Sequence, residues 1–84
     1  MFRIEWEKKA LKQFSKLPLN DRKSINKSVK KLSKWPECQN VKALSNHDYQ
    51  YRLRVGRYRI FFDIENILKI LRIEEVKKRD ERTY

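Results

Sequence analysis

Cysteine, glycine and histidine each occur once in the 84 residues, and proline occurs twice. The single cysteine, Cys38, excludes an internal disulfide and is typical of a reducing compartment. No apolar run approaches the roughly 20 residues that a membrane-spanning helix needs. The opening segment, residues 1–6, is charged and lacks the apolar stretch of a signal peptide. These absences predict a cytoplasmic protein with no membrane segment.

Acidic residues are also scarce relative to basic ones. The chain carries 22 lysines and arginines against 11 aspartates and glutamates, and its formal net charge is +11. Such an excess is typical of a nucleic-acid-binding domain, although a solubilising surface or a patch for an acidic protein partner would have the same sign. Most lysines lie in the first half and most arginines in the second. Because a guanidinium matches phosphate oxygens in a bidentate fork, we expect phosphate to bind in the second half.

The first half has the pattern of one strand and two helices. Residues 2–6 alternate apolar and charged side chains, as a half-buried strand does. Helical spacing follows until Pro18, and a second helix is expected to begin near Asn20 or Asp21, either of which could cap it, and to end at Trp35. The apolar stripes of these helices are Ala10, Leu11, Phe14 and Leu17, and then Ile25, Val29 and Leu32. The loop that follows is expected to be held against the core by Val41, Ala43 and Leu44.

The second half has the pattern of three consecutive strands. Residues 49–55 and 58–64 alternate, and residues 67–73 form a nearly continuous apolar run, which predicts a central strand covered on both faces. The charged residues 77–84 are expected to form a tail. The order of elements predicts a single α+β domain over residues 1–84, in which two antiparallel helices pack on one face of an antiparallel sheet of about four strands.

Gly56 and Arg57 lie between two alternating runs and suit the two-residue turn of a β-hairpin. That turn sets the register, so both faces of the hairpin can be assigned. The predicted pairs are Val55 with Tyr58, Arg54 with Arg59, Leu53 with Ile60, and Arg52 with Phe61. The side chains expected under the helices are Tyr51, Leu53, Val55, Tyr58, Ile60 and Phe62. Those expected on the open face are Arg52, Arg54, Arg59 and Phe61.

Three like charges at neighbouring positions of an uncovered face repel one another, which is expected where an anion binds. The alternative is that acidic side chains or an acidic partner screen them. Phe61 among the arginines is either core at the sheet edge or a stacking surface for an unpaired base. The candidates for screening are Asp63, Glu74 and Glu75.

The lysines of the second helix form either a solvated face or a docking surface for RNA. They are Lys23, Lys27, Lys30, Lys31 and Lys34.

The segment 51–62, YRLRVGRYRIFF, resembles the signature hairpin of the RelE/ParE toxin superfamily. The preceding residues 41–44, the opening strand with two basic helices, and the ending 78–84 are similar to the same family, so the resemblance covers essentially the whole chain. It implies a RelE-like fold and a toxin of a type II toxin-antitoxin system. RelE-like members are ribosome-dependent ribonucleases that cut messenger RNA in the decoding site, whereas ParE-like members poison DNA gyrase. The basic hairpin with a C-terminal Arg and Tyr resembles the first branch.

The resemblance also implies roles for individual residues. Arg52 and Arg54 match basic residues of the family's active face, and Arg59 matches its phosphate-binding arginine. The residues expected to contact RNA around this site are Lys27, Lys30, Lys31, Lys34, Arg57, Phe61, Lys77 and Lys78.

The types of side chain present limit the mechanisms by which this protein could cleave RNA. Histidine occurs only once, which excludes a pair of histidines acting as acid and base. That residue, His47, is expected to be a solvated loop residue. No cysteine-histidine cluster is present, and Asp63, Glu74 and Glu75 lack metal-ligand spacing, so neither a metal nor another cofactor is expected. What remains is cleavage by the 2′-hydroxyl of RNA itself.

In this metal-free reaction Tyr84, which matches the family's tail tyrosine, is expected to be the general base. Arg59 and Arg52 would stabilise the charge on the phosphate, and either Arg79 or Arg82 would neutralise the leaving oxygen. The implied partners are the ribosome with its messenger RNA, and a cognate antitoxin whose acidic or amphipathic segment wraps the basic surface. The alternatives are a gyrase poison on the same fold and a non-catalytic nucleic-acid-binding module.

Overall fold

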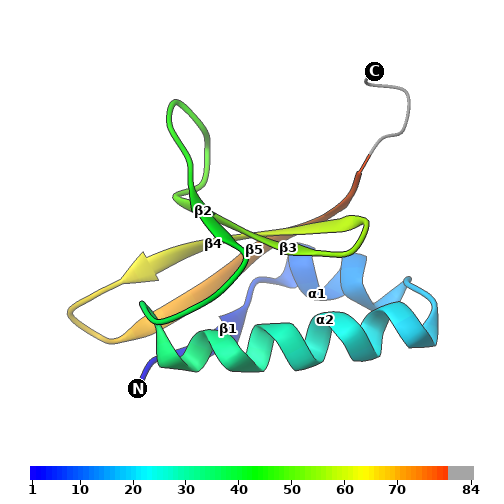
Figure 1. Cartoon of the computed structure of the whole chain (residues 1–84), viewed down its shortest axis with the longest axis horizontal. Coiled ribbons are helices and arrows are strands. Elements are labelled where there is room, and N and C mark those ends of the chain that lie inside the picture. Colours follow the sequence, from blue (N-terminus) through cyan, green and yellow to red (C-terminus); the bar gives the residue numbers. More distant parts are fainter. Residues whose placement is uncertain (80–84) are drawn as a thin grey trace.

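A five-stranded sheet with two helices on one face makes up residues 1–79, the part of the chain that the computed structural model describes (Figure 1). The helices are α1 (Lys8–Ser15) and α2 (Leu19–Lys31), and a short 3₁₀ helix, η1 (Leu32–Lys34), follows α2. The strands are β1 (Arg3–Trp6), β2 (Val41–Ala43), β3 (Tyr51–Val55), β4 (Tyr58–Glu65) and β5 (Ile70–Lys78).

The strands lie in the order β1-β5-β4-β3-β2, and all neighbours are antiparallel except β1 and β5, which are parallel. The α+β class and the placement of both helices on one face are confirmed. The sheet is mixed and has a fifth strand, because part of the predicted loop pairs with β3 as the edge strand β2. Three residues are too few to show an alternating pattern, so the sequence did not reveal this strand.

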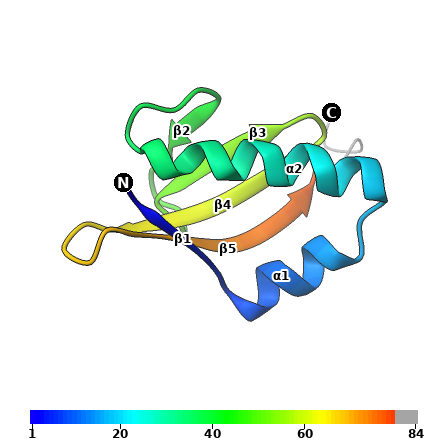
Figure 2. The same ribbon diagram turned by 90° about the horizontal axis from the view of Figure 1, so that it is seen from below.

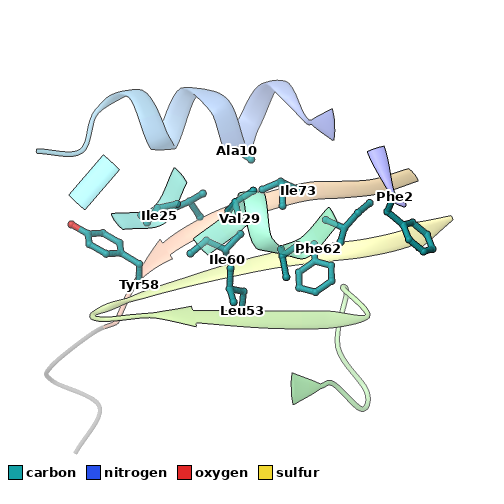
Figure 3. Close-up of a cluster of buried hydrophobic side chains, with 12 residues drawn as sticks. Phe2, Ala10, Ile25, Val29, Leu53, Tyr58, Ile60, Phe62 and Ile73 are labelled. Atoms are coloured by element: carbon teal, nitrogen blue, oxygen red, sulfur yellow. The ribbon is translucent and has the colours of Figure 1, made fainter. Parts of the chain in front are cut away.

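The core lies between the helices and the sheet. Figure 2 shows α2 lying across the β3–β4 side of the sheet and α1 beside β5. The predicted stripe of the second helix is confirmed, since Ile25, Val29 and Leu32 are at most 2% exposed. They pack toward Ile60 and Phe62 of β4, which are fully buried (Figure 3). Of the predicted first stripe, Ala10 is buried and Phe14 and Leu17 pack partly buried against the core, whereas Leu11 is exposed.

The start of α2 differs from the expectation. The N-cap is Pro18, with neither Asn20 nor Asp21 in that position, and no side chain caps the helix. Asp21 lies in the first turn, where the helix dipole favours a negative charge. Its Oδ2 accepts a hydrogen bond of 2.8 Å from the hydroxyl of Tyr58, so this carboxylate joins the helix to the sheet.

The last strand lies further along the chain than predicted. Ile67 and Leu68 are 89% and 67% exposed in the turn before β5, and the strand continues through Lys78 into the predicted tail. β5 is flanked by β1 and β4, but its outer side is not covered by a helix. The apolar run therefore combined a turn with a strand, and hydrophobicity alone could not separate them. None of the helices in residues 1–79 is long and apolar enough to cross a membrane.

Candidate nucleic-acid interface

The hairpin formed by β3 and β4 pairs in the predicted register. Arg54 lies opposite Arg59, and Arg52 lies opposite Phe61. Gly56 has φ +55°, a left-handed conformation that glycine adopts without strain. The register turns the three arginines to the side of the sheet that faces away from the helices. We call this outer side of β3 and β4 the arginine face.

Strand pairing extends the arginine face into two rows that cross the sheet. The first row consists of Arg54, Arg59 and Lys77. The second row consists of Lys42, Arg52, Phe61 and Glu75. Lys42 joins the cationic group because β2 is a strand, which sequence reasoning did not reveal. The rows therefore gather cations from four strands around one aromatic ring and one carboxylate.

Arg52 lies at the centre of this cationic group. Its Nε is buried and lacks a hydrogen-bond partner within residues 1–79. Burial lowers the pKa of its guanidinium, and the like charges of Arg59 and Arg54 lower it further. Leaving a buried donor unsatisfied costs about 1–3 kcal/mol. An anion bound beside the three guanidinium groups would reduce the repulsion among them.

Acidic side chains near the arginine face bind to other groups. Oδ1 of Asp63 accepts a 2.7 Å hydrogen bond from the backbone N–H of Gln50. Burial and a hydrogen bond with Asp63 raise the pKa of Glu74 to about 7. Glu75, which is only 8% exposed, accepts a 3.0 Å hydrogen bond from the hydroxyl of Tyr49 and lies near Lys9 and Lys77, at 3.5 and 3.8 Å. Screening of the three arginines by these predicted candidates is therefore not observed within residues 1–79.

The opposite part of the outer side, along β1, is balanced in charge. Arg3 forms an ion pair of 2.8 Å with Glu5, and Arg72 forms one of 3.2 Å with Glu7. The outer side of the sheet thus divides into a charge-paired part near β1 and a cationic part over β3 and β4. An anionic ligand would be attracted to the cationic part.

Phe61 is not presented to solvent. It is 7% exposed, because the loop between β2 and β3 folds over it. The ring of His47 stacks on Phe61 at 5.1 Å between centroids, and the ring of Tyr49 lies 5.6 Å away. Phe61 is therefore core at the sheet edge, and the idea that it stacks on a base is wrong. His47 is an exposed loop residue, as predicted, and its ring also packs on Phe61. The sequence carried no signal for this, because a loop shows no periodicity.

The remaining basic residues of the hairpin and of β5 lie around the arginine face. Arg57 is exposed in the turn, and Lys77 is in the first row beside Arg59. Lys78 pairs with Tyr58, so its register places it on the helix side of the sheet. The backbone N–H of Arg79 donates a 2.7 Å hydrogen bond to the carbonyl oxygen of Arg57. The predicted tail residues Arg82 and Tyr84 lie outside the described residues.

The predicted RNA-binding lysines of the second helix are separate from the arginine face. They belong to α2 and η1, which lie on the opposite side of the sheet (Figure 1). All four are exposed: Lys27, Lys30, Lys31 and Lys34. Within residues 1–79 no three histidine, cysteine, aspartate or glutamate side chains form a group that could hold a metal ion.

Solved structures of RelE toxins have a similar fold. The isolated toxin of E. coli superposes with a TM-score of 0.84 at 16% identity, over 99% of this chain and 89% of that chain. RelE in the archaeal RelE-RelB complex from Pyrococcus horikoshii gives 0.79 at 24% identity, over 95% and 97%. The toxin-antitoxin complex RelBE2 from Mycobacterium tuberculosis gives 0.79 at 21% identity, over 93% and 98%. No curated protein matches the chain in sequence.

A match between the sequence and a family model identifies the family. The model for "ParE toxin of type II toxin-antitoxin system, parDE" matches residues 4–79. This range covers the helices and strands of the described residues, apart from Arg3 at the start of β1, and both rows of the arginine face. The recognition of the RelE/ParE superfamily from the hairpin is therefore confirmed. The chain belongs to the ParE toxin family, and it is a type II toxin of the RelE/ParE superfamily with a RelE-like fold.

Proposed function

We propose that this toxin is an endoribonuclease that cuts messenger RNA on the ribosome, with the arginine face as its phosphate-binding site. The observation that carries the proposal is the group of Arg52, Arg54 and Arg59 at adjacent positions, without an acidic partner among residues 1–79. Such a group destabilises an empty sheet face and becomes favourable when a phosphate binds.

In the proposed reaction the 2′-oxygen of RNA attacks the adjacent phosphorus and the bond from phosphorus to the 5′-oxygen breaks. The products are a 2′,3′-cyclic phosphate and a free 5′-hydroxyl. Arg59 and Arg52 stabilise the charge that builds on the phosphate oxygens. Tyr84 accepts the proton of the 2′-hydroxyl as general base. Arg79 or Arg82 neutralises the leaving 5′-oxygen, which takes its proton from water.

The position of Arg79, directly after β5, supports a role for the C-terminal tail in this reaction. The hydrogen bond from Arg79 to Arg57 joins the last described residue to the turn of the arginine hairpin. The first row of the arginine face, which contains Arg59 and Lys77, lies next to this contact. Arg79 therefore lies at the border of the arginine face.

The ribosome is the proposed source of substrate orientation. A protein of this size has little surface with which to align an RNA strand, and orientation alone can supply several kcal/mol of rate acceleration. The exposed lysines on α2 and η1 are suited to contact ribosomal RNA while the arginine face meets the message. We propose Lys27, Lys30, Lys31 and Lys34 for that contact.

A cognate antitoxin is the second proposed partner. The relatives from Pyrococcus horikoshii and Mycobacterium tuberculosis were solved as toxin-antitoxin complexes. With a net charge of +11, this toxin would attract an antitoxin segment that is acidic or amphipathic. Binding of that segment over the arginine face would block access of RNA.

Inhibition of DNA gyrase is a second candidate function, because the family model that matches residues 4–79 is that of ParE toxins. On this alternative the arginine face would bind DNA or an acidic protein surface without cutting. A non-catalytic nucleic-acid-binding role is the third possibility that the same cations support.

Induction of the toxin followed by two measurements separates these functions. Incorporation of labelled amino acids and thymidine shows which process stops first, and mapping of 5′ ends shows whether messages are cut. We expect early loss of translation with cuts at a fixed codon position. Arrest of replication without cuts would instead support the gyrase function, and growth without arrest would support a binding module.

The site itself is tested with Arg59→Ala and Tyr84→Phe. We expect Arg59→Ala to lower the rate of message cleavage by about 10²–10³-fold, since it removes a preorganised charge at the transition state. Arg3→Ala is the matched control, because Arg3 lies on β1 and is paired with Glu5. Normal cleavage by both Arg59→Ala and Tyr84→Phe would show that the site assignment is wrong.

A further inference from the structure

The loop between β2 and β3 builds an aromatic platform beside the arginines. Figure 1 shows this loop standing on the side of the sheet away from α1 and α2. Its residue His47 lies over Phe61, with the two ring planes only 15° apart and their centroids 5.1 Å apart. Tyr49 lies against both rings, at 5.8 Å from His47 and 5.6 Å from Phe61. The three rings form one cluster on the outer side of β4, in which His47 and Phe61 are stacked and Tyr49 is tilted.

The platform is held in place by hydrogen bonds. The backbone N–H of Tyr49 donates to Nδ1 of His47 over 3.1 Å, which fixes the orientation of the imidazole. The hydroxyl of Tyr49 donates to Oε1 of Glu75 over 3.0 Å, and Glu75 is buried. Burial and this hydrogen bond raise the pKa of Tyr49 to about 12, so the phenol keeps the proton that it donates. The loop is thereby joined to β5.

The outer ring surface of the platform is accessible. One side of the imidazole rests on Phe61, while His47 as a residue is exposed. An exposed aromatic side chain is the kind of surface on which unpaired bases stack.

The platform lies beside Arg52, one of the arginines proposed to bind phosphate. Phe61, which supports His47, is the direct cross-strand partner of Arg52. Side chains at such opposite positions start about 5 Å apart at their Cβ atoms. A nucleotide whose phosphate binds the guanidinium group of Arg52 therefore lies on the same side of the sheet as His47, which covers Phe61.

From this juxtaposition we infer that His47 is a base-stacking residue, which receives one unpaired RNA base next to the phosphate bound by Arg52 and its neighbours. The inference rests on the proposed function for the identity of the ligand as RNA. It assigns Phe61, Tyr49 and Glu75 the role of positioning residues, since each acts through the orientation of His47. It also explains why an aromatic ring in the arginine face is covered by another aromatic ring from a distant loop.

Cleavage on programmed ribosomes tests the inference. The message carries either a normal base or an abasic nucleotide at each position of the decoding codon in turn. We expect one position at which the abasic nucleotide slows the wild-type toxin by about 10-fold, in the range of single base-stacking contacts. His47→Ala should be slowed equally with the normal base, and the abasic nucleotide should slow it no further. His47→Phe should restore the rate, whereas an acid-base role for the imidazole would leave this variant inactive.

Ser45→Ala is the matched control, because Ser45 is an exposed residue of the same loop. It should cut at the wild-type rate. The inference is overturned if His47→Ala cuts at the wild-type rate, or if the abasic nucleotide slows His47→Ala as much as it slows the wild type. In both cases the wild-type toxin still cuts, so the proposed function stands.

A binding measurement covers the case in which the toxin does not cut. The probe is a four-nucleotide 2′-O-methyl RNA that contains 2-aminopurine, whose fluorescence falls when its base stacks. We expect quenching by the wild type and by His47→Phe, with about 10-fold weaker binding to His47→Ala. Quenching without cleavage would contradict the nuclease function and leave the stacking site supported. Equal binding by His47→Ala, or no quenching by the wild type, would overturn the stacking site.

Discussion

Arg52, which we propose binds phosphate, is unfavourable in the unbound fold. Its Nε is buried without a partner among residues 1–79, and its nearest charged neighbours on the arginine face are cations. Functional sites commonly retain such unfavourable groups because the ligand makes them favourable. The free energy of unfolding and the affinity for nucleic acid should therefore change in opposite directions at this residue.

We predict that Arg52→Met raises the free energy of unfolding by about 1 kcal/mol, since methionine keeps the apolar stem and removes both the unmet donor and the repulsion. Urea denaturation measures this change, and the same variant should lose affinity for RNA. Arg3→Met, which removes an exposed and paired arginine, should change stability by less than about 0.5 kcal/mol. Loss of stability in Arg52→Met would contradict the proposed repulsion.

Glu74 is a second residue whose ionisation is altered by the fold. Burial raises the pKa of its carboxyl to about 7 from an ordinary 4.5, and a hydrogen bond with Asp63 and the charge of Glu7 act in the same direction. Arg72 is the facing group that opposes the shift. The folded state therefore binds this proton more tightly than the unfolded state does.

Because the folded pKa is the higher one, protonated Glu74 favours the fold, and this contribution declines as the pH rises from about 4.5 through 7. We predict that Glu74→Gln, which stays neutral, is more stable than the wild type at pH 8 by on the order of 1 kcal/mol. At pH 4 the difference should nearly vanish. Denaturation of both proteins across this range gives the difference directly, and a difference that does not depend on pH would contradict the assignment.

The hairpin of β3 and β4 is the element on which the site depends. Its turn uses a left-handed residue at Gly56, with φ +55°. A Cβ at this position would meet no atom within 4 Å, so only backbone conformation disfavours other residues. The register that follows from the turn puts the three arginines together on one side.

We predict that Gly56→Ala lowers the free energy of unfolding by about 1 kcal/mol, through the strain of a left-handed alanine. Gly56→Asn should lower it by less, because asparagine tolerates this conformation. Thermal or urea denaturation compares the two variants. Equal losses in both would indicate a steric effect, which the open surroundings of the turn do not support.

The molecule as a whole carries two basic surfaces on opposite sides of one sheet. The arginine face covers β3 and β4, and the exposed lysines cover α2 and η1 on the other side. The overall extents are 38 × 29 × 24 Å, so a large partner such as a ribosome could contact both surfaces at once. The two surfaces should therefore contribute separately to association.

We predict that glutamine at Lys27, Lys30, Lys31 and Lys34 together weakens ribosome association and lowers its salt dependence by about one unit of slope per lysine that contacts phosphate. Cleavage by ribosome-bound toxin should remain, because the arginine face is unchanged. Association measured at several salt concentrations checks the first part, and single-turnover cleavage checks the second. An unchanged slope would show that these lysines form only a solvated surface.

Much of the site could be predicted from local patterns in the sequence. The alternation around Gly56 specified the hairpin register, and the helical spacing of Ile25, Val29 and Leu32 specified the buried stripe of α2. The excess of positive charge pointed to an anionic partner. These features were predictable because a strand repeats every two residues and a helix every 3.6, so neighbouring residues alone determine which face is buried.

Only the tertiary structure decided what surrounds the arginines. The contact between Tyr49 and Glu75 joins residues 26 positions apart, and the stacking of His47 on Phe61 likewise joins the loop to a strand. The short strand β2, which adds Lys42 to the cationic rows, also exists only through its pairing with β3. Contacts of this kind leave no period in the sequence, because they arise when distant segments meet in the folded chain and find partners for their hydrogen bonds and rings.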